Sequence, residues 1–396
     1  MPPRLKALLW LVFPEGALLA AAAIVLRLAA VRASLPAVAH FYPYVVFGAG
    51  ALIAWRFHRS RLLFGLLVLA LASVGLRGTH LSAQLTALLL PLNLAGLALL
   101  AERGTLTPFG FIRLAAIGAQ VFFAELCLRT AATATTALLN WPFLPARFVP
   151  FPALGQPVLL AFALSLGLVG VALFFTPNAI TRGYFWAIVA SLLGATAPSR
   201  TATAVYLGTA GLILVVAVLE ASYLLAYQDG LTALPARRAL TEAMQRLAGQ
   251  YAVAMVDVDH FKQFNDRYGH DVGDQVLRMV AAKLAEVEGG GRAYRYGGEE
   301  FAIVFAGKNV DEALPHLERI RLDVEQTRFT IRGRLRPRRR PDQPKPRKKA
   351  SRDVAITVSI GVAARSARYA NPDQVIKAAD RALYAAKQDG RNRVRA

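Results

Sequence analysis

Residues 294–301 read Tyr-Arg-Tyr-Gly-Gly-Glu-Glu-Phe, and this octet is the most informative stretch of the chain. The runs on either side of it are rich in β-formers, so Gly297 and Gly298 are expected at the tip of a hairpin. Glycine at such a tip lets a backbone or a phosphate approach closely. Glu299 and Glu300 follow at once and supply the oxygen ligands that a hard cation such as Mg²⁺ prefers. The octet alone is equally compatible with a hairpin that has a solvated acidic tip.

A second stretch, residues 253–274, complements the octet. Its apolar start predicts a buried strand that ends at Asp257 and Asp259. Carboxylates at a strand end, opposite a hairpin that carries two glutamates, can build a two-metal site for phosphoryl transfer. Each aspartate could instead cap the next helix, and this alternative carries more weight for Asp259 than for Asp257.

Six separated motifs, in order, resemble those of the GGDEF-domain diguanylate cyclases, in the glutamate variant of the signature. The similarity covers roughly residues 227–394. The motifs are Asp229-Gly-Leu-Thr-Ala-Leu-Pro-Ala-Arg-Arg, Asp257-x-Asp-x-Phe-Lys-x-Phe-Asn-Asp, Gly269-His-x-x-Gly-Asp274, the octet, Thr357-Val-Ser-Ile-Gly-Val-Ala and Asp380-x-Ala-Leu-Tyr-x-Ala-Lys387-x-x-Gly-Arg391-Asn.

The resemblance implies a metal site at the octet. Asp257, the backbone carbonyl of Val258 and Glu299 would hold Mg²⁺ or Mn²⁺. Glu300 would lie beside the metals, as a further ligand or an electrostatic aid. The two glutamates, with Lys262, are the expected catalytic residues.

The resemblance also implies a nucleotide site for GTP. Asn265 and Asp274 would bind the guanine edge, since a carboxylate accepts from the ring N–H and the amino group. Lys262, Lys387 and Arg391 match the phosphate-binding positions, where cations offset the charge that develops during phosphoryl transfer.

The reaction implied is the condensation of two GTP into cyclic di-GMP with release of pyrophosphate. One domain of this family binds one GTP, so the active enzyme is expected to be a homodimer with a shared active site. Family members often carry an Arg-x-x-Asp product-inhibition motif before the signature. Residues 288–291 read Glu-Gly-Gly-Gly instead, so no product-inhibition site is expected there.

An insertion at residues 332–353 has eleven Lys or Arg, two Asp and four Pro, a composition typical of disorder. It is either a tolerated hairpin loop or a contact to anionic lipid, worth on the order of 1 kcal/mol per basic residue. The formal net charge of the chain is +21, and the insertion contributes +9 of it, eleven minus two. No specific nucleic-acid binding is expected, because no aromatic residues are interleaved to stack bases.

The first 221 residues are overwhelmingly apolar, with fourteen Lys or Arg and four Asp or Glu. Because a membrane-spanning helix needs about 20 apolar residues, we predict about eight helices in a transmembrane sensor or anchor domain, residues 1–221. The spans are near residues 7–29, 37–55, 62–76, 84–101, 109–128, 152–175, 183–198 and 202–221.

The topology of these spans can be checked against charge. The cyclase needs GTP from the cytoplasm, and eight spans then put both termini inside, with the basic loop at residues 56–61. The expected location is the bacterial inner membrane. A cleaved signal peptide over residues 1–23 is the rival interpretation. Glu15, a charge within an apolar span, is expected to pair with Arg27 of the same helix or a neighbour.

The predicted architecture is a helical transmembrane bundle, a short signalling helix at residues 222–228 and an α/β (α+β) domain at 229–396. This last domain should have a mostly antiparallel sheet flanked by helices, similar to nucleotidyl cyclase and polymerase palm folds. Its predicted elements are helix 236–248, strand 251–257, helix 261–288, hairpin 292–306, helix 310–327, strand 354–364 and helix 373–388. Two rival functions remain: a catalytically silent GTP receptor of the same fold, and a transporter with an appended regulatory domain.

Overall fold

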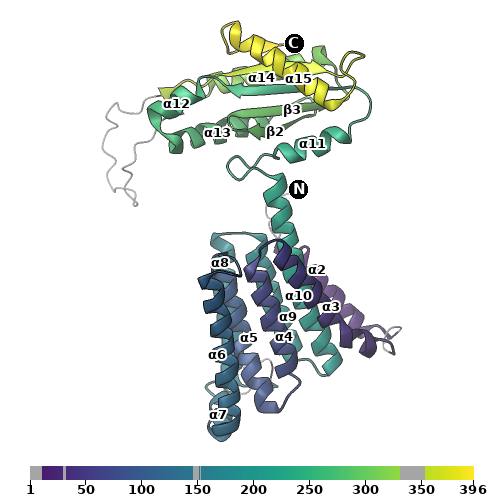
Figure 1. Cartoon of the computed structure of the whole chain (residues 1–396), viewed down its shortest axis with the longest axis vertical. Coiled ribbons are helices and arrows are strands. Elements are labelled where there is room, and N and C mark those ends of the chain that lie inside the picture. The colour runs from purple at the N-terminus through teal and green to yellow at the C-terminus, as the bar shows by residue number, and fades with distance from the viewer. Residues whose placement is uncertain (1–10, 30–32, 146–150, 152, 331–352) are drawn as a thin grey trace. The chain divides into compact units, whose positions relative to one another are not determined.

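The computed structural model describes residues 11–29, 33–145, 151, 153–330 and 353–396 (Figure 1). The chain divides into two compact units, Met1–Ser222 and Tyr223–Ala396, which are described in turn. The basic insertion predicted at residues 332–353 lies outside the described residues, apart from the backbone of its last residue.

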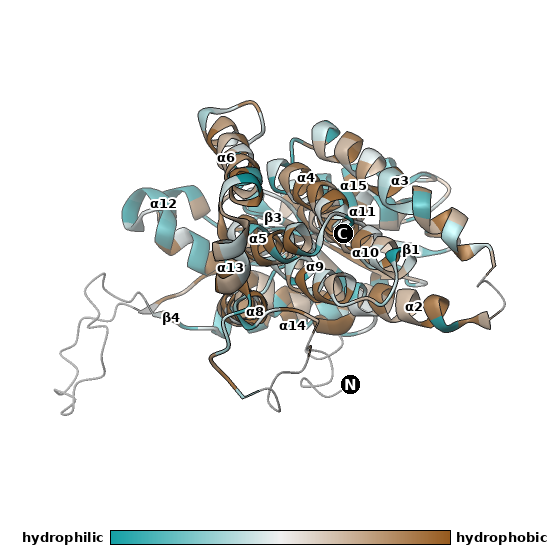
Figure 2. Ribbon diagram, turned by 90° about the horizontal axis from the view of Figure 1, so that it is seen from below, coloured by the Kyte–Doolittle hydropathy of each residue, from teal (hydrophilic) through white to brown (hydrophobic). Residues whose placement is uncertain are grey.

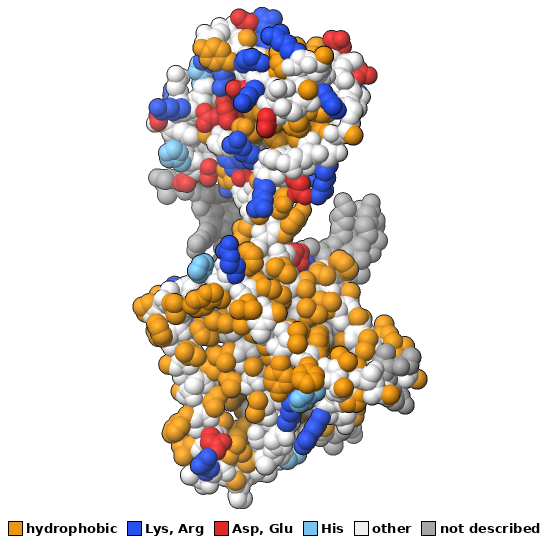
Figure 3. Space-filling model, turned by 45° about the vertical axis from the view of Figure 1, so that its right-hand side comes forward, with side chains coloured by type: hydrophobic (Ala, Val, Ile, Leu, Met, Phe, Trp, Pro, Cys, Tyr) orange, Lys and Arg blue, Asp and Glu red, His pale blue; other side chains and the backbone are white. Residues whose placement is uncertain are grey.

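The described part of the first unit is helical. Five of its helices are long and apolar enough to cross a membrane (α3, α5, α6, α8 and α10), and α4 and α9 are shorter apolar helices. Hydrophobic ribbon dominates this bundle in Figure 2, and apolar side chains cover the face of the unit visible in Figure 3. The helices are α2 (Glu15–Arg27), α3 (Leu35–Arg56), α4 (Ser60–Gly75), α5 (His80–Leu99), α6 (Pro108–Thr130), α7 (Ala132–Leu139), α8 (Gln156–Phe175), α9 (Ala179–Ala195) and α10 (Arg200–Tyr227).

A charged cluster is buried among the apolar helices of this unit. Arg182 of α9 lies with its Nε 2.8 Å from Glu15 Oε2 of α2, and both side chains are fully buried. Arg182 also pairs with Glu220 of α10. Of the two partners expected for Glu15, a residue of a neighbouring helix is therefore the one found. Arg27 lies at the exposed end of α2, whereas a buried carboxylate requires a partner at its own depth.

The second unit is built on a five-stranded sheet with the order β2-β3-β1-β6-β7. All neighbouring strands are antiparallel except β6 and β7. Strands β4 and β5 pair in a second, two-stranded sheet. The elements are α11 (Arg237–Gln245), β1 (Tyr251–Val258), α12 (Phe261–Tyr268), α13 (His270–Ala285), β2 (Gly291–Gly297), β3 (Glu300–Ala306), α14 (Val310–Gln326), β4 (Phe329–Thr330), β5 (Asp353–Val354), β6 (Val358–Ala364), α15 (Pro372–Gln388) and β7 (Val394–Arg395).

The central strand β1 is buried along its whole length because helices cover both faces of the sheet. Its residues alternate between two hydrophobic clusters. Ala252, Ala254 and Val256 pack in the cluster that includes residues of α13 and α14. Tyr251 and Val253 pack in the cluster that includes residues of α11 and α15. This two-sided burial explains the continuous apolar run in the sequence.

The mostly antiparallel sheet and its flanking helices confirm the predicted fold class. Two elements differ. The helix predicted over 261–288 is two helices, α12 and α13, separated at Gly269, whose φ is +84°. The strand predicted over 354–364 is divided between β5, which pairs with β4, and β6, which begins at Val358. A second glycine fixes the packing of α15. A Cβ at Gly361 of β6 would lie 1.9 Å from the Leu383 backbone nitrogen, so α15 can approach this strand closely only at a glycine.

Candidate functional site

The end of β1 and the signature turn meet at one edge of the sheet. Asp257 is the register partner of Glu300, the first residue of β3. The Val258 N–H donates to the Glu299 carbonyl at 3.4 Å. Gly298 in the turn has φ +54°, a conformation that glycine adopts without strain. The antiparallel register of β1 and β3 therefore brings three carboxylates of two distant motifs together.

The negative charges of these carboxylates repel one another. Burial raises the pKa of Asp257, against the opposing effect of Lys387 and Arg391. Burial, followed by the charge of Asp257, raises the pKa of Glu299 and of Glu300. Lys387 of α15 lies with its Nζ 2.8 Å from Asp257 Oδ2. The cluster thus carries an excess of negative charge that a bound cation would offset.

The donor set suits a hard cation. No group of three or more His, Cys, Asp or Glu side chains that could hold a metal occurs in the part of the chain that the structure describes. Asp257, Glu299 and the backbone carbonyl of Val258 are the residues that would hold a cation here. The available donors are all oxygens, which Mg²⁺ prefers. The residues fit Mg²⁺ on this chemistry.

Asn265 of α12 lies against α13. A Cβ at Gly273 would be 1.9 Å from Asn265 Oδ1, so the carboxamide occupies the space that only a glycine leaves. Asn265 Oδ1 is buried and has no hydrogen-bond partner among the described residues. Asp274 follows Gly273 and is half-buried. Buried polar atoms are normally paired, so this unpaired oxygen is unusual.

The three predicted phosphate-binding cations come from two regions. Lys262 is exposed in the first turn of α12. Lys387 lies in the last turn of α15, and Arg391 follows in a loop with φ +65°. The Arg391 N–H donates to the Ala386 carbonyl at 3.0 Å, which ties the loop to the end of α15. Lys387 and Arg391 both act on the charge of Asp257.

Asp259 has a structural role that sequence reasoning left open. It does not cap α12, whose N-cap has no side-chain bond. Its carboxylate accepts from Thr357 Oγ1 and Ser359 Oγ, each at 2.7 Å, and from the Asn392 N–H at 3.1 Å. Asp259 therefore fastens the loop that carries Arg391 to β6. The two hydroxyls in the Thr-Val-Ser motif were a usable signal.

Arg295, inside the signature octet, was also missed. Its Nη1 donates to Asp229 Oδ1 at 2.6 Å and its Nη2 donates to the Gly298 carbonyl at 2.7 Å. The same Asp229 oxygen accepts from the Thr232 N–H and hydroxyl. Burial alone would raise the pKa of Asp229, but the bonds from Thr232 and Arg295 outweigh it and lower that pKa. Arg295 thus connects the opening motif to the signature turn.

Comparison with known proteins identifies the family of the second unit. Residues 226–393 match the model of the diguanylate cyclase GGDEF domain. Residues 226–393 form a GGDEF domain. Relatives of the GGDEF domain include the response regulator PleD of Caulobacter vibrioides, 35% identical over 44% of this chain and 37% of PleD. Diguanylate cyclase DosC of Escherichia coli is 36% identical over 36% of this chain and 27% of DosC. The chain thus spans 37% of the length of PleD and 27% of the length of DosC.

Solved structures are also similar to this chain. The coiled coil and GGDEF domain of DgcB from Caulobacter crescentus, solved with c-di-GMP, is 35% identical, with 45% of this chain and 89% of that chain covered and a TM-score of 0.38. The active GGEEF domain of a Vibrio cholerae diguanylate cyclase is 29% identical, with 40% and 89% covered and a TM-score of 0.31.

Proposed function

We propose that the GGDEF domain condenses two molecules of GTP into cyclic di-GMP and releases pyrophosphate. The observation that carries this proposal is the junction of β1 with the signature turn. There Asp257, Glu299 and Glu300 lie together, with Lys387 2.8 Å from Asp257. The relatives named diguanylate cyclases support the same reaction.

In this proposal the substrate is held by residues of α12, α13, α15 and the loop after α15. Asn265 and Asp274 bind the guanine edge of GTP, and the unpartnered Asn265 oxygen supports that role. Lys387 and Arg391 bind the triphosphate and offset the charge that builds up during transfer, as Lys262 does from α12. Mg²⁺ or Mn²⁺, when bound by Asp257, Glu299 and the Val258 carbonyl, supplies Lewis-acid stabilisation of the transferred phosphoryl group.

A single domain holds one GTP, whereas the product contains two nucleotides. We propose that two copies of the chain face each other as a homodimer. The 3′-hydroxyl of the GTP on one copy then attacks the α-phosphorus of the GTP on its partner, and pyrophosphate leaves. The two half-sites contribute mainly by holding the reacting groups in position.

The apolar helices of the first unit support a location in the bacterial inner membrane. Five of them have the length and composition of membrane spans. We propose that residues 1–221 form a sensor or anchor in the bilayer, with about eight spans and both termini in the cytoplasm. Residues 222–228 would carry the signal to the GGDEF domain. The basic segment 332–353 would contact anionic lipid.

A turnover assay tests the proposal. Purified full-length chain is incubated with GTP and Mg²⁺ beside Glu299→Ala, with the exposed Glu286→Ala as a matched control. Cyclic di-GMP is expected from the wild type and from Glu286→Ala, and not from Glu299→Ala. GTP binding without product in all three would favour the silent-receptor alternative. An artificially dimerised fragment of residues 223–396 then distinguishes that alternative from an enzyme that lacks its stimulus.

A further inference from the structure

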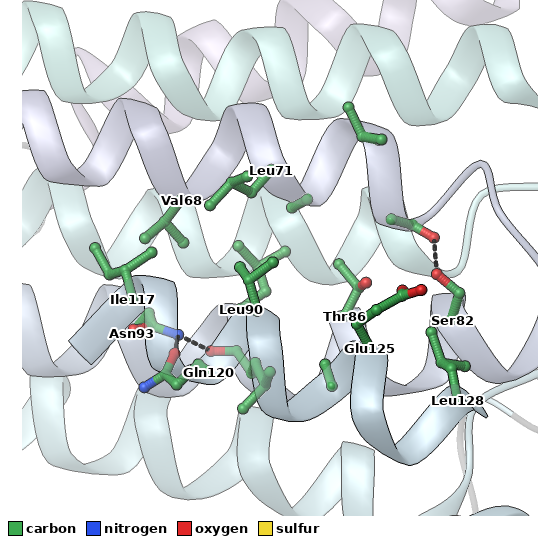
Figure 4. Close-up of a pocket in the computed structure, with 16 residues that line it drawn as sticks. Val68, Leu71, Ser82, Thr86, Leu90, Asn93, Ile117, Gln120, Glu125 and Leu128 are labelled. Atoms are coloured by element: carbon green, nitrogen blue, oxygen red, sulfur yellow. Dashed lines mark hydrogen bonds between the residues drawn. The ribbon is translucent and has the colours of Figure 1, made fainter. Parts of the chain in front are cut away.

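A cavity of about 320 Å³ lies between α4, α5 and α6 of the first unit (Figure 4). Most of its wall is aliphatic, including Val68 and Leu71 of α4, Leu90 of α5 and Ile117 of α6. A largely apolar wall with a few polar groups is typical of a binding site for a small molecule. The function proposed above does not use this cavity.

The polar groups of the wall form two sets. Figure 4 shows Asn93 and Gln120 together, and Ser82, Thr86 and Glu125 together farther along the same helices. Thr86 and Asn93 are seven residues apart on α5, which places them about 10 Å apart along the helix axis. An apolar stretch therefore separates two places where a ligand can form hydrogen bonds.

The pair of Asn93 and Gln120 has unused hydrogen-bonding capacity. Asn93 Nδ2 donates to the Leu89 carbonyl at 2.9 Å and to Gln120 Oε1 at 2.7 Å. Among the described residues, no hydrogen bond is made by Asn93 Oδ1 or by Gln120 Nε2. The two side chains thus leave one acceptor and one donor at the cavity wall.

The position of Asn93 and Gln120 along their helices indicates the chemical class of the ligand. Gln120 is twelve residues from Pro108 and ten from Thr130, the ends of α6, or about 18 Å and 15 Å. In the bilayer location proposed above, the pair lies near the middle of a hydrocarbon core about 30 Å thick. Lipid acyl chains offer no hydrogen bond at this depth, and unpaired polar groups there are costly. A charged group would also be costly.

We propose that this cavity binds an uncharged amphiphile, with an apolar body beside Leu90 and Ile117 and an amide group at Asn93 and Gln120. The amide N–H₂ donates to Asn93 Oδ1, and its carbonyl accepts from Gln120 Nε2. The body extends along the apolar stretch that separates this pair from Thr86. The site belongs to the membrane unit and is separate from the GTP site.

The test uses the full chain in lipid nanodiscs. Decanamide is the probe, and dodecane, which has the same number of heavy atoms, is the control ligand. A ligand that binds only the folded protein raises its unfolding temperature. Decanamide is expected to raise it more than dodecane does in the wild type and in Phe122→Leu, a control on the exposed side of α6. In the double variant Asn93→Leu/Gln120→Leu the affinity should fall by about tenfold, so that this preference disappears.

Two results would overturn the proposal. One is equal stabilisation of the wild type by both ligands, which would mean that the cavity accepts only acyl chains. The other is an undiminished preference for decanamide in the double variant. A diazirine-bearing alkyl amide gives a second measurement on the unmodified chain, independent of whether the variant folds. It should label α5 and α6, with decanamide a better competitor than dodecane; equal competition contradicts the proposal.

Discussion

Gly273→Ala tests the proposed contact between Asn265 and the base of GTP. The new Cβ would lie 1.9 Å from Asn265 Oδ1 and 3.0 Å from its Cγ, whereas ordinary contacts are 3.4–4 Å. The carboxamide must therefore retreat by more than 1 Å. A hydrogen bond lengthened by that amount is no longer formed.

The size of the effect follows from the bonds lost. A carboxamide can make two bonds to a purine edge, each worth about 0.5–1.5 kcal/mol, so the KM for GTP should rise by about tenfold. The fold should persist. Alanine improves helix propensity by about 1 kcal/mol, which offsets much of an overpacking cost of about 1–3 kcal/mol.

The assay is steady-state cyclic di-GMP formation, with thermal unfolding measured on the same samples. Gly230→Ala is the matched control, because a Cβ there meets nothing within 4 Å. Asn265→Ala should raise KM similarly, and adding Gly273→Ala to it should have little further effect, because both changes remove one interaction. A folded Gly273→Ala protein with an unchanged KM would refute the assignment of Asn265 to the base.

Three further predictions concern stability and coupling. Arg295→Met should lower the free energy of unfolding by about 1–3 kcal/mol at neutral pH. Because the pKa of Asp229 is lowered in the fold, this loss should become smaller as the pH falls below about 4. Equal losses at neutral pH and below about pH 4 would contradict this prediction. Arg182→Met should destabilise the full chain by about 3–5 kcal/mol in detergent unfolding, with partial recovery when Glu15→Gln is added; no change would show that the buried pair is dispensable. Insertions of one to four residues after Ala221 should change cyclase activity with helical phase, and activity independent of the insertion length would exclude coupling through helix rotation.

The strands and the signature hairpin could be predicted because their signals are local. A run of eight buried residues and a Gly-Gly turn between β-formers determine β1, β2 and β3. The break between α12 and α13 was missed because an isolated glycine is often tolerated within a helix. The short pairs β4-β5 and β6-β7 depend on contacts between distant residues, which periodicity does not report.

The side chains that support the site were harder to predict than the residues proposed to bind the metal and the nucleotide. Asp229 and Arg295 are separated by 66 residues, and Asp259 and Asn392 by 133. Their motifs were visible, but a single sequence does not show which motif residue contacts which. Nor did the sequence show the pairing of Glu15 with Arg182, since any basic residue at a similar depth in the bundle was an eligible partner.

These supporting contacts also bear on the stability of the domain. Burial raises the pKa of Asp257, Glu299 and Glu300, so ionisation of these groups costs more in the folded domain than in the unfolded chain and opposes folding. Arg295 holds the turn beside them, and Asp259 anchors the loop that presents Arg391. A cation bound at the carboxylates would remove part of their repulsion and add binding free energy to the folded state. Mg²⁺ should therefore raise the unfolding temperature of the wild type and have a much smaller effect on Glu299→Ala; an equal rise in both would place the bound cation elsewhere.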